Sequence, residues 1–304
     1  MKLVKVDSGV VGAEPERFNS SFHTEAEAPI LLPPTEIPYS FERWLPLISR
    51  TQNIPSSSIQ VITLSRSQGN LLLKASQSSL IRRETSRMYA EDLDDEIKPT
   101  LSSLIFPPGG LFLRFAACSP KDGVGGTTPL RTVNDILLRI ATSFRATNSI
   151  RNILDTDATG IKLLFLPHNS RMETAREYRV FCPPPSGLIA ALSQYKWHQP
   201  SKFHDRDPDD IEKTIQTIMM GTRRIHTEIL KELGNPGACK VAELVLQQGF
   251  TFDISFDEET GRSYLVELNA FGTRSGCGSC LFHWLTDNAQ LYGREQDVEF
   301  RISI

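Results

Sequence analysis

The sequence contains no apolar run that approaches the ~20 residues needed to span a membrane. It also lacks an excess of either charge, because 33 basic and 36 acidic residues give a net charge of −3. With this balance, the sequence does not predict the excess of positive charge that binds nucleic acid or an anionic membrane. The N-terminal stretch MKLVKVDSGVVGAEPERF lacks the sustained apolar core of a secretory signal. We therefore expect a cytoplasmic protein whose partners are neither nucleic acids nor membranes.

Cysteine is scarce, and its distribution does not suggest a disulfide framework. The five cysteines are Cys118, Cys182, Cys239, Cys277 and Cys280. An odd and scattered set in a long chain predicts reduced thiols. Cys277, Cys280 and His283 have a spacing that could bind zinc, but a structural zinc needs four ligands and no second pair is nearby. Packing cysteines in a glycine-rich loop are the favoured interpretation.

The glycine-rich phosphate-binding motifs GxGxxG and the P-loop are absent, and there is no internal repeat. Two glycine pairs flank the segment 111–123, namely Gly109 and Gly110, and Gly125 and Gly126. They could form a flap over a phosphate group or plain turns, and plain turns are the favoured interpretation.

Hydrophobic periodicity predicts an α+β fold built on antiparallel sheets, because strands, helices and hairpins are mixed along the chain. We expect an extended lead-in over residues 1–40, an N-terminal subdomain over 41–108 and a core over 109–304. The predicted elements are a short helix at 40–48, strand–turn–strand at 56–77, strands at 111–117 and 160–166, a helix around 132–146, a hairpin over 176–195, a helix from Asp207 to Gly234, and strands at 242–247, 250–257 and 263–271.

The last two strands carry an acidic pattern. The stretch FTFDISFD-EETG-RSYLVELNAF predicts a β-hairpin that turns around Gly261. If Phe256 lies opposite Tyr264, then Asp253 lies opposite Glu267 on the same face of the sheet.

Asn269 lies two residues beyond Glu267 and therefore points to the same side. Two carboxylates this close repel each other unless a cation lies between them or one is protonated. Carboxylate and amide oxygens are ligands that Mg²⁺ accepts together with nucleotide phosphates. The pattern therefore predicts either a magnesium site at Asp253, Glu267 and Asn269 or a solvated hairpin that carries acids by chance.

An acid on one strand followed by acid-x-Asn on the next resembles the magnesium signature of ATP-grasp proteins. Further blocks occur in one order and resemble the cell division cycle protein 123 family, which assembles eukaryotic translation initiation factor two. These blocks are FLRFAACSPKDG (112–123), REYRVFC (176–182), LIAALSQY (188–195), FTFDISFD (250–257) and YLVELNAFG followed by CLFHWL. The resemblance covers residues 110 to 286 and implies an ATP-grasp fold, in which antiparallel sheets clasp ATP.

Carried over residue by residue, the resemblance assigns Mg²⁺ to Asp253, Glu267 and Asn269. The residues that match the family's nucleotide-binding positions are Arg114, Asp122, Glu177, Arg179 and Gln194. Arg179 would hold phosphate and, in an enzyme, act as a catalytic residue that offsets charge on the transferring phosphoryl group. The alternative for Arg179 is a salt bridge at the protein surface.

The chain also departs from the family pattern. Arg114 stands where the family has a lysine, and a second lysine expected near LLFLPHN is absent, with His168 the nearest candidate cation. Glu267 replaces an aspartate, and the family's long acidic insertions are largely missing.

Two functions remain open from the sequence. The favoured one is an ATP-dependent ligase that joins a small-molecule carboxylate to an amine through an acyl phosphate, as in fungal specialised metabolism. The alternative is an ATP-binding assembly chaperone whose partner is the γ subunit of translation initiation factor two.

Overall fold

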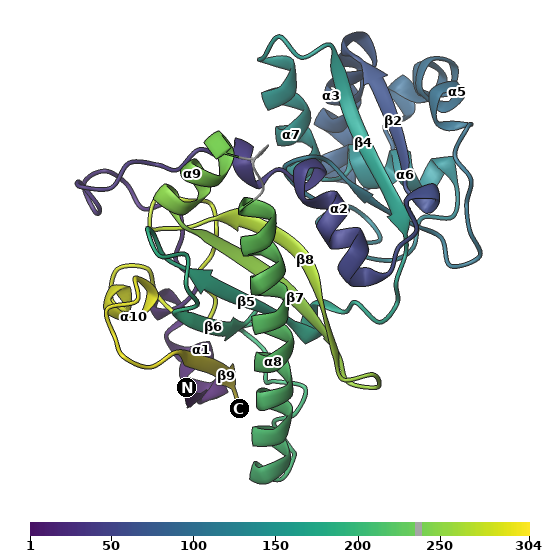
Figure 1. The fold of residues 1–304 in the computed structure, drawn as a ribbon. Helices are drawn as coiled ribbons and strands as arrows, with labels where there is room; N and C mark the ends of the chain where they lie inside the picture. Colours follow the sequence, from purple (N-terminus) through teal and green to yellow (C-terminus); the bar gives the residue numbers. More distant parts are fainter. Residues whose placement is uncertain (235–238) are drawn as a thin grey trace. The chain divides into compact units, whose positions relative to one another are not determined.

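The computed structural model describes residues 1–234 and 239–304, and the chain divides into two compact units. Unit 1 consists of Met1–Gln52 and Ser170–Ile304, and unit 2 consists of Asn53–Asn169. Within the described ranges, no helix has the length and apolar character needed to cross a membrane. The units differ from the predicted division at 40/41 and 108/109, because the first residues of the chain form a strand in the sheet that the last residues also build (Figure 1).

Unit 1 is built on a six-stranded mixed sheet (Figure 1). Its strands, in spatial order, are β1 (Lys2–Val6), β9 (Glu299–Ser303), β6 (Ala191–Gln194), β5 (Glu177–Cys182), β7 (Phe250–Asp257) and β8 (Arg262–Ala270). The pairs β1–β9 and β9–β6 are parallel, whereas β6–β5, β5–β7 and β7–β8 are antiparallel. The sheet is therefore mixed where the sequence predicts only antiparallel pairing, since pairs made by the chain ends leave no local pattern.

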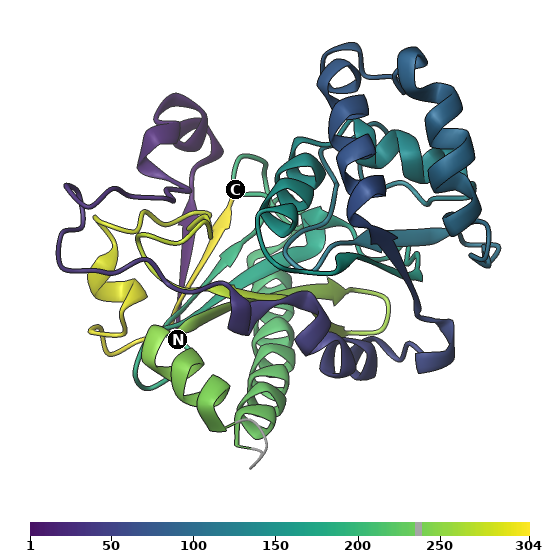
Figure 2. The same ribbon diagram turned by 90° about the horizontal axis from the view of Figure 1, so that it is seen from above.

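Helices α8 (Pro208–Leu233) and α9 (Cys239–Gln248) lie on one face of this sheet (Figure 2). The Asp207 side chain accepts a hydrogen bond from the Asp209 backbone N–H, and Pro208 occupies the first helical position. On the buried side of α8, the His226 ring stacks on Phe250 and Phe252, each at 6.2 Å between ring centroids. The predicted helix from Asp207 to Gly234 is confirmed.

Helix α2 (Phe41–Gln52) protects the outer edge of β8 and confirms the short helix predicted there. Gln52 Nε2 donates to the Leu265 carbonyl at 2.7 Å, and the Leu265 N–H donates to Thr51 Oγ1 at 3.1 Å. These side chains satisfy backbone groups of an edge strand that could otherwise pair with another chain.

Unit 2 contains a three-stranded antiparallel sheet in the order β2 (Gln60–Ser65), β4 (Gly160–Pro167) and β3 (Leu111–Arg114). Its core joins this sheet to α3 (Arg66–Arg82), α6 (Val133–Ala141) and α7 (Phe144–Leu154) through residues such as Leu64, Leu72, Ile136, Ile150 and Phe165. The shorter helices of the chain are α1 (Ser8–Ala13), α4 (Ala90–Asp92), a π-helical turn (Leu93–Ile97), α5 (Lys98–Leu101) and α10 (Asn288–Leu291). Short 3-10 turns occur at Pro15–Arg17, Ile37–Tyr39, Ser56–Ser58, Arg87–Tyr89 and Thr174–Arg176.

Three predicted elements differ from the structure. The helix predicted around 132–146 is two helices, α6 and α7, because Ser143 caps the start of α7. The second half of the strand–turn–strand at 56–77 is helix α3, which starts with a capping box in which Ser65 and Gln68 bond each other's backbone N–H groups. Gly69 favoured a turn at this point, but it lies inside the helix, where an added Cβ would collide with Ile161 Cδ1. The strand predicted at 242–247 lies within α9, whose buried Ala242 and Val245 have helical spacing.

Candidate functional site

A row of polar side chains crosses the sheet of unit 1 on the face opposite α8. Arg179 of β5 lies opposite Asp253 of β7, and Asp253 lies opposite Glu267 of β8. Opposed residues share a face, so these three side chains are neighbours. Asn269 follows two residues later, opposite Thr251, on the same face. The register predicted for Asp253 and Glu267 is confirmed, and it brings the three predicted metal ligands to one face.

The hairpin register is not uniform along its length. The predicted pairing of Phe256 with Tyr264 is off by one residue, since Phe256 lies opposite Ser263. The register shifts between Asp253 and Ile254, where a β-bulge adds one residue to β8. Bulges re-aim the side chains next to them, and this one lies directly beside the acidic pair.

Arg179 and Asp253 form a buried, two-point ion pair. Arg179 Nε donates to Asp253 Oδ1 at 2.8 Å, and Nη2 donates to Asp253 Oδ2 at 2.7 Å. The two residues are 6% and 1% exposed. Burial alone would lower the pKa of Arg179, but the charge of Asp253 and its hydrogen bonds raise that pKa well above the ordinary value. The alternative of a surface salt bridge for Arg179 is wrong, because this pair is buried.

The rest of the Arg179 guanidinium is held from two further directions. Its Nη1 donates to the Gly278 carbonyl at 2.7 Å, and its central carbon lies 5.0 Å from the centroid of the Tyr195 ring. Planar guanidinium groups stack on aromatic faces in this way. Arg179 is therefore fixed in orientation by a carboxylate, a carbonyl and a ring.

The segment 271–286, which follows β8 and contains Gly278, is called the site loop below. Trp284 Nε1 donates to the Cys277 carbonyl at 2.8 Å, and Cys277 Sγ lies 3.0 Å from Thr251 Oγ1. Burial raises the pKa of the Cys277 thiol to about 11, so this thiol is protonated at neutral pH. In residues 1–234 and 239–304, no three or more His, Cys, Asp or Glu side chains are grouped to hold a metal ion, so the zinc alternative gains no support.

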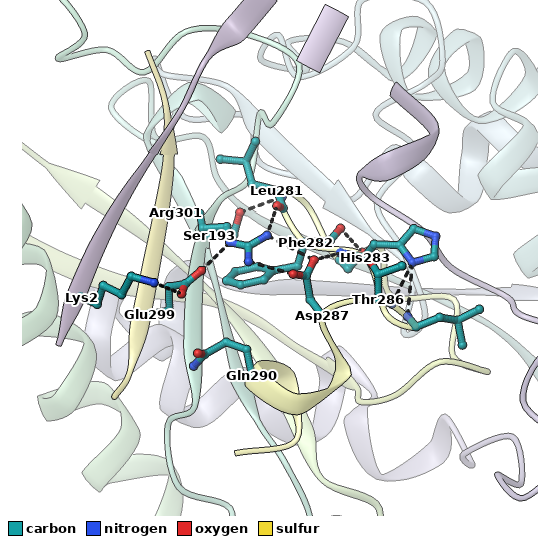
Figure 3. A network of polar contacts seen from close by, with 12 residues as sticks. Lys2, Ser193, Leu281, Phe282, His283, Thr286, Asp287, Gln290, Glu299 and Arg301 are labelled. Carbon is teal, nitrogen blue, oxygen red and sulfur yellow. Dashed lines mark hydrogen bonds and ion pairs between the residues drawn. The ribbon is translucent and has the colours of Figure 1, made fainter. Parts of the chain in front are cut away.

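A second arginine, which the sequence analysis missed, fastens the site loop to the sheet (Figure 3). Arg301 of β9 lies opposite Ser193, whose other neighbour is Arg179. Arg301 Nη2 donates to Asp287 Oδ1 at 2.8 Å, and Nη1 donates to the Leu281 carbonyl at 3.0 Å. Ser193 Oγ in turn accepts the Leu281 N–H at 2.9 Å.

The Arg301 guanidinium also lies over the Phe282 ring, 3.9 Å from its centroid, and Nε donates to Glu299 Oε1 at 2.6 Å. A signal for this cluster exists in the sequence, because Glu299, Arg301 and Ser303 alternate with apolar residues along β9. The family blocks end at residue 286, before this strand.

Asp257 is another buried acid on the site face, four residues after Asp253. Burial would raise the pKa of Asp257, but hydrogen bonds from Thr260, Arg171 and the Glu259 backbone N–H lower it below the ordinary value. A carboxyl group whose pKa is lower in the folded state stabilises the fold above its unfolded pKa. That stabilisation is lost as pH falls through the folded pKa.

We therefore expect the free energy of unfolding to decrease below about pH 5, and to decrease less steeply in Asp257→Asn. Urea unfolding at a series of pH values measures this slope. The matched control is the exposed Asp157→Asn, whose profile should follow the wild type. An unchanged slope in Asp257→Asn would refute the assignment.

The remaining residues predicted to bind nucleotide are in different places. Glu177 is buried on the site face, two residues before Arg179. Gln194 lies opposite Tyr178, on the face that α8 covers. Its Nε2 donates to the carbonyls of Lys196 and Gln199 at 2.8 and 2.6 Å. The structure thus places Gln194 away from the row of Arg179, and we leave it out of the proposed site.

Arg114 and Asp122 belong to unit 2. Arg114 is buried at the end of β3. The Asp122 carboxylate accepts Ser143 Oγ at 2.5 Å and the Arg145 N–H at 3.1 Å, which ties its loop to the start of α7. Arg139 of α6 also holds this loop, because it donates from Nη1 to the Gly126 carbonyl and from Nε to the Val124 carbonyl. These bonds support the interpretation of the glycines as turns.

The donor set at Asp253, Glu267 and Asn269 suits Mg²⁺, because it offers two carboxylates and one amide oxygen on one face. Each carboxylate oxygen can accept more than one bond, so the ion pair with Arg179 still leaves acceptor capacity on Asp253. Asn269 Nδ2 donates to Glu267 Oε1 at 3.5 Å, so the two side chains are neighbours on the site face.

A comparison with protein-family models finds no match, and a comparison with curated proteins finds no significant one. Solved structures do match. The structure of Cdc123 from Schizosaccharomyces pombe matches with a TM-score of 0.55 and 16% identity, over 88% of this chain and 96% of that one. The C-terminally truncated Cdc123 from the same organism matches with a TM-score of 0.54 and 17% identity, over 87% and 95%. The chain therefore has the α+β fold of Cdc123 over most of its length.

Proposed function

We propose that the chain is an ATP-binding protein that acts as an assembly factor for translation initiation factor two, with the γ subunit as its partner. The observation that carries this proposal is the row formed by the buried pair Arg179 and Asp253 and the half-buried Glu267 within a Cdc123-like fold. The order of the sequence blocks, which resembles the cell division cycle protein 123 family, supports the same function.

In this proposal Asp253, Glu267 and Asn269 hold Mg²⁺, and Glu177 and Arg179 line the nucleotide side. When bound, the metal ion would offset the negative charge of the phosphates. Asp253 accepts two hydrogen bonds that orient Arg179. In this proposal it would also ligate the ion. Arg114 and Asp122 of unit 2 stay predictions for nucleotide binding.

The geometry of Arg179 favours binding over ligation. A catalytic arginine must bring its donors to the transferring phosphoryl group, where charge develops. Here one edge of the guanidinium is occupied by Asp253 and a third donor by the Gly278 carbonyl. These bonds use three of the five guanidinium N–H donors and hold Arg179 as a fixed part of a nucleotide site, which is what an assembly factor needs.

The purified chain should bind the isolated γ subunit more tightly with ATP and Mg²⁺ than without them. It should release no ADP above background when pooled carboxylic acids, amino acids and amines are added. Calorimetry with the γ subunit and a coupled ADP assay measure the two properties on one sample. Release of ADP that depends on an acid and an amine, without binding of the γ subunit, would identify the ligase instead.

A further inference from the structure

The segment of residues 18–42 differs in composition from the rest of the chain. It contains no lysine or arginine, and its acids are Glu25, Glu27, Glu36 and Glu42. Three of its apolar side chains are almost fully exposed: Ile30 at 91%, Leu32 at 86% and Ile37 at 81%. The segment thus combines negative charge with apolar side chains that face solvent.

Residues 19–39, called the N-terminal strap below, are fastened to the site loop at their beginning. The Phe22 N–H donates to the Ser275 carbonyl at 2.9 Å, and the His23 N–H donates to the Thr273 carbonyl at 3.0 Å. The bonds use the backbone of the strap, so they do not depend on its apolar side chains.

The other end of the strap is also held. Arg274 Nη1 donates to the Leu31 carbonyl at 2.7 Å, and Tyr39 Oη donates to the Gly249 carbonyl at 2.6 Å. Between these anchors the strap forms the dark purple loop beside α9 in Figure 1. An exposed segment with fixed ends has already lost much of the conformational entropy that binding would otherwise cost.

Isolated exposed apolar residues are common and need no explanation. Here three of them occur within eight residues, next to Pro29, Pro33, Pro34 and Pro38. Proline fixes the backbone angle φ and stiffens an extended segment. A stiff, anchored run of exposed apolar side chains has the character of an interaction surface.

We propose that the N-terminal strap is a docking surface for a protein with an apolar groove rimmed by basic residues. The groove would take Ile30, Leu32 and Ile37. The basic rim would complement Glu25, Glu27 and Glu36 of a strap that contains no lysine or arginine. This inference rests on the proposed function, from which it takes the γ subunit as the partner.

The test compares three proteins in calorimetric titrations with the γ subunit and with ATP and Mg²⁺. Ile30→Asp/Leu32→Asp/Ile37→Asp should bind the γ subunit at least about tenfold more weakly, because it puts charges into an apolar contact. Ile81→Asp/Met88→Asp is the matched control in unit 2, where these side chains are 84% and 82% exposed. It should bind like the wild type. Retained ATP affinity in both variants shows that they are folded.

Each other outcome has a defined meaning. Wild-type affinity for the γ subunit in the strap variant would overturn this inference alone. Absence of γ-subunit binding by the wild type would overturn both this inference and the proposed function. A wild-type dimer that the strap variant turns into a monomer would show that a second copy of the chain covers the strap. The γ-subunit affinity of the wild type should also fall as salt rises, and an affinity independent of salt would refute the basic rim.

Discussion

Asp253→Leu is expected to lower the free energy of unfolding by about 3–5 kcal/mol. The substitution leaves the Arg179 guanidinium buried without the carboxylate that accepts two of its hydrogen bonds. Arg179→Met should cost a similar amount, because it strands the Asp253 carboxylate instead. Denaturant unfolding monitored by circular dichroism measures both changes.

The double variant Arg179→Met/Asp253→Leu is the decisive control. Once both charges are gone, neither is buried without a partner, so the double variant should be more stable than either single variant. Strict additivity of the two losses would contradict the ion pair. All three variants should lose magnesium-dependent ATP binding, which separates the role of the pair in the site from its role in the fold.

Trp284→Ala is expected to cost about 3–5 kcal/mol of unfolding free energy. The Trp284 ring is fully buried and meets Phe181 and Phe271 edge-on, at 5.5 and 4.9 Å between centroids. Its indole N–H also donates to the Cys277 carbonyl within the site loop. The variant therefore loses both the packing beneath the loop and a hydrogen bond within it.

Trp284→Phe is the matched control for this second prediction. It keeps an aromatic ring in the core but removes the donor to Cys277, so it should cost less than Trp284→Ala. Equal losses in the two variants would mean that the hydrogen bond, and not ring packing, accounts for the effect. Thermal and urea unfolding of the two variants compare them directly.

The acidic hairpin could be predicted from the sequence because its information is local. Alternation along a strand puts Asp253 on one face, and a short turn around Gly261 puts Glu267 opposite it. The β-bulge beside Asp253 could not be predicted, since no residue pattern in the stretch requires an extra residue there. The ion pair of Arg179 could not be predicted either, because its partner Asp253 lies 74 residues away in sequence.

Helix α3 and the polar cluster on β9 do have local signals in the sequence. Ser65 and Gln68 have the spacing of a capping box, which predicts the start of a helix. Gly69, which follows directly, instead favours a turn. The alternation of Glu299, Arg301 and Ser303 along β9 predicts a polar face on this strand. It does not predict that Arg301 bonds Asp287 and the Leu281 carbonyl. Those contacts come from a loop, and loop conformation is set by tertiary packing that periodicity does not describe.

We propose that Glu267, together with Asp253 and Asn269, binds ATP through Mg²⁺. The measurement is calorimetric titration with ATP of the wild type in Mg²⁺, of the wild type in excess EDTA, and of Glu267→Gln in Mg²⁺. We expect binding by the wild type that requires Mg²⁺, and roughly tenfold or weaker affinity in Glu267→Gln, because the variant removes one charged ligand and keeps the size of the side chain. Equal affinity in all three titrations, or no binding of ATP by the wild type, would contradict the claim.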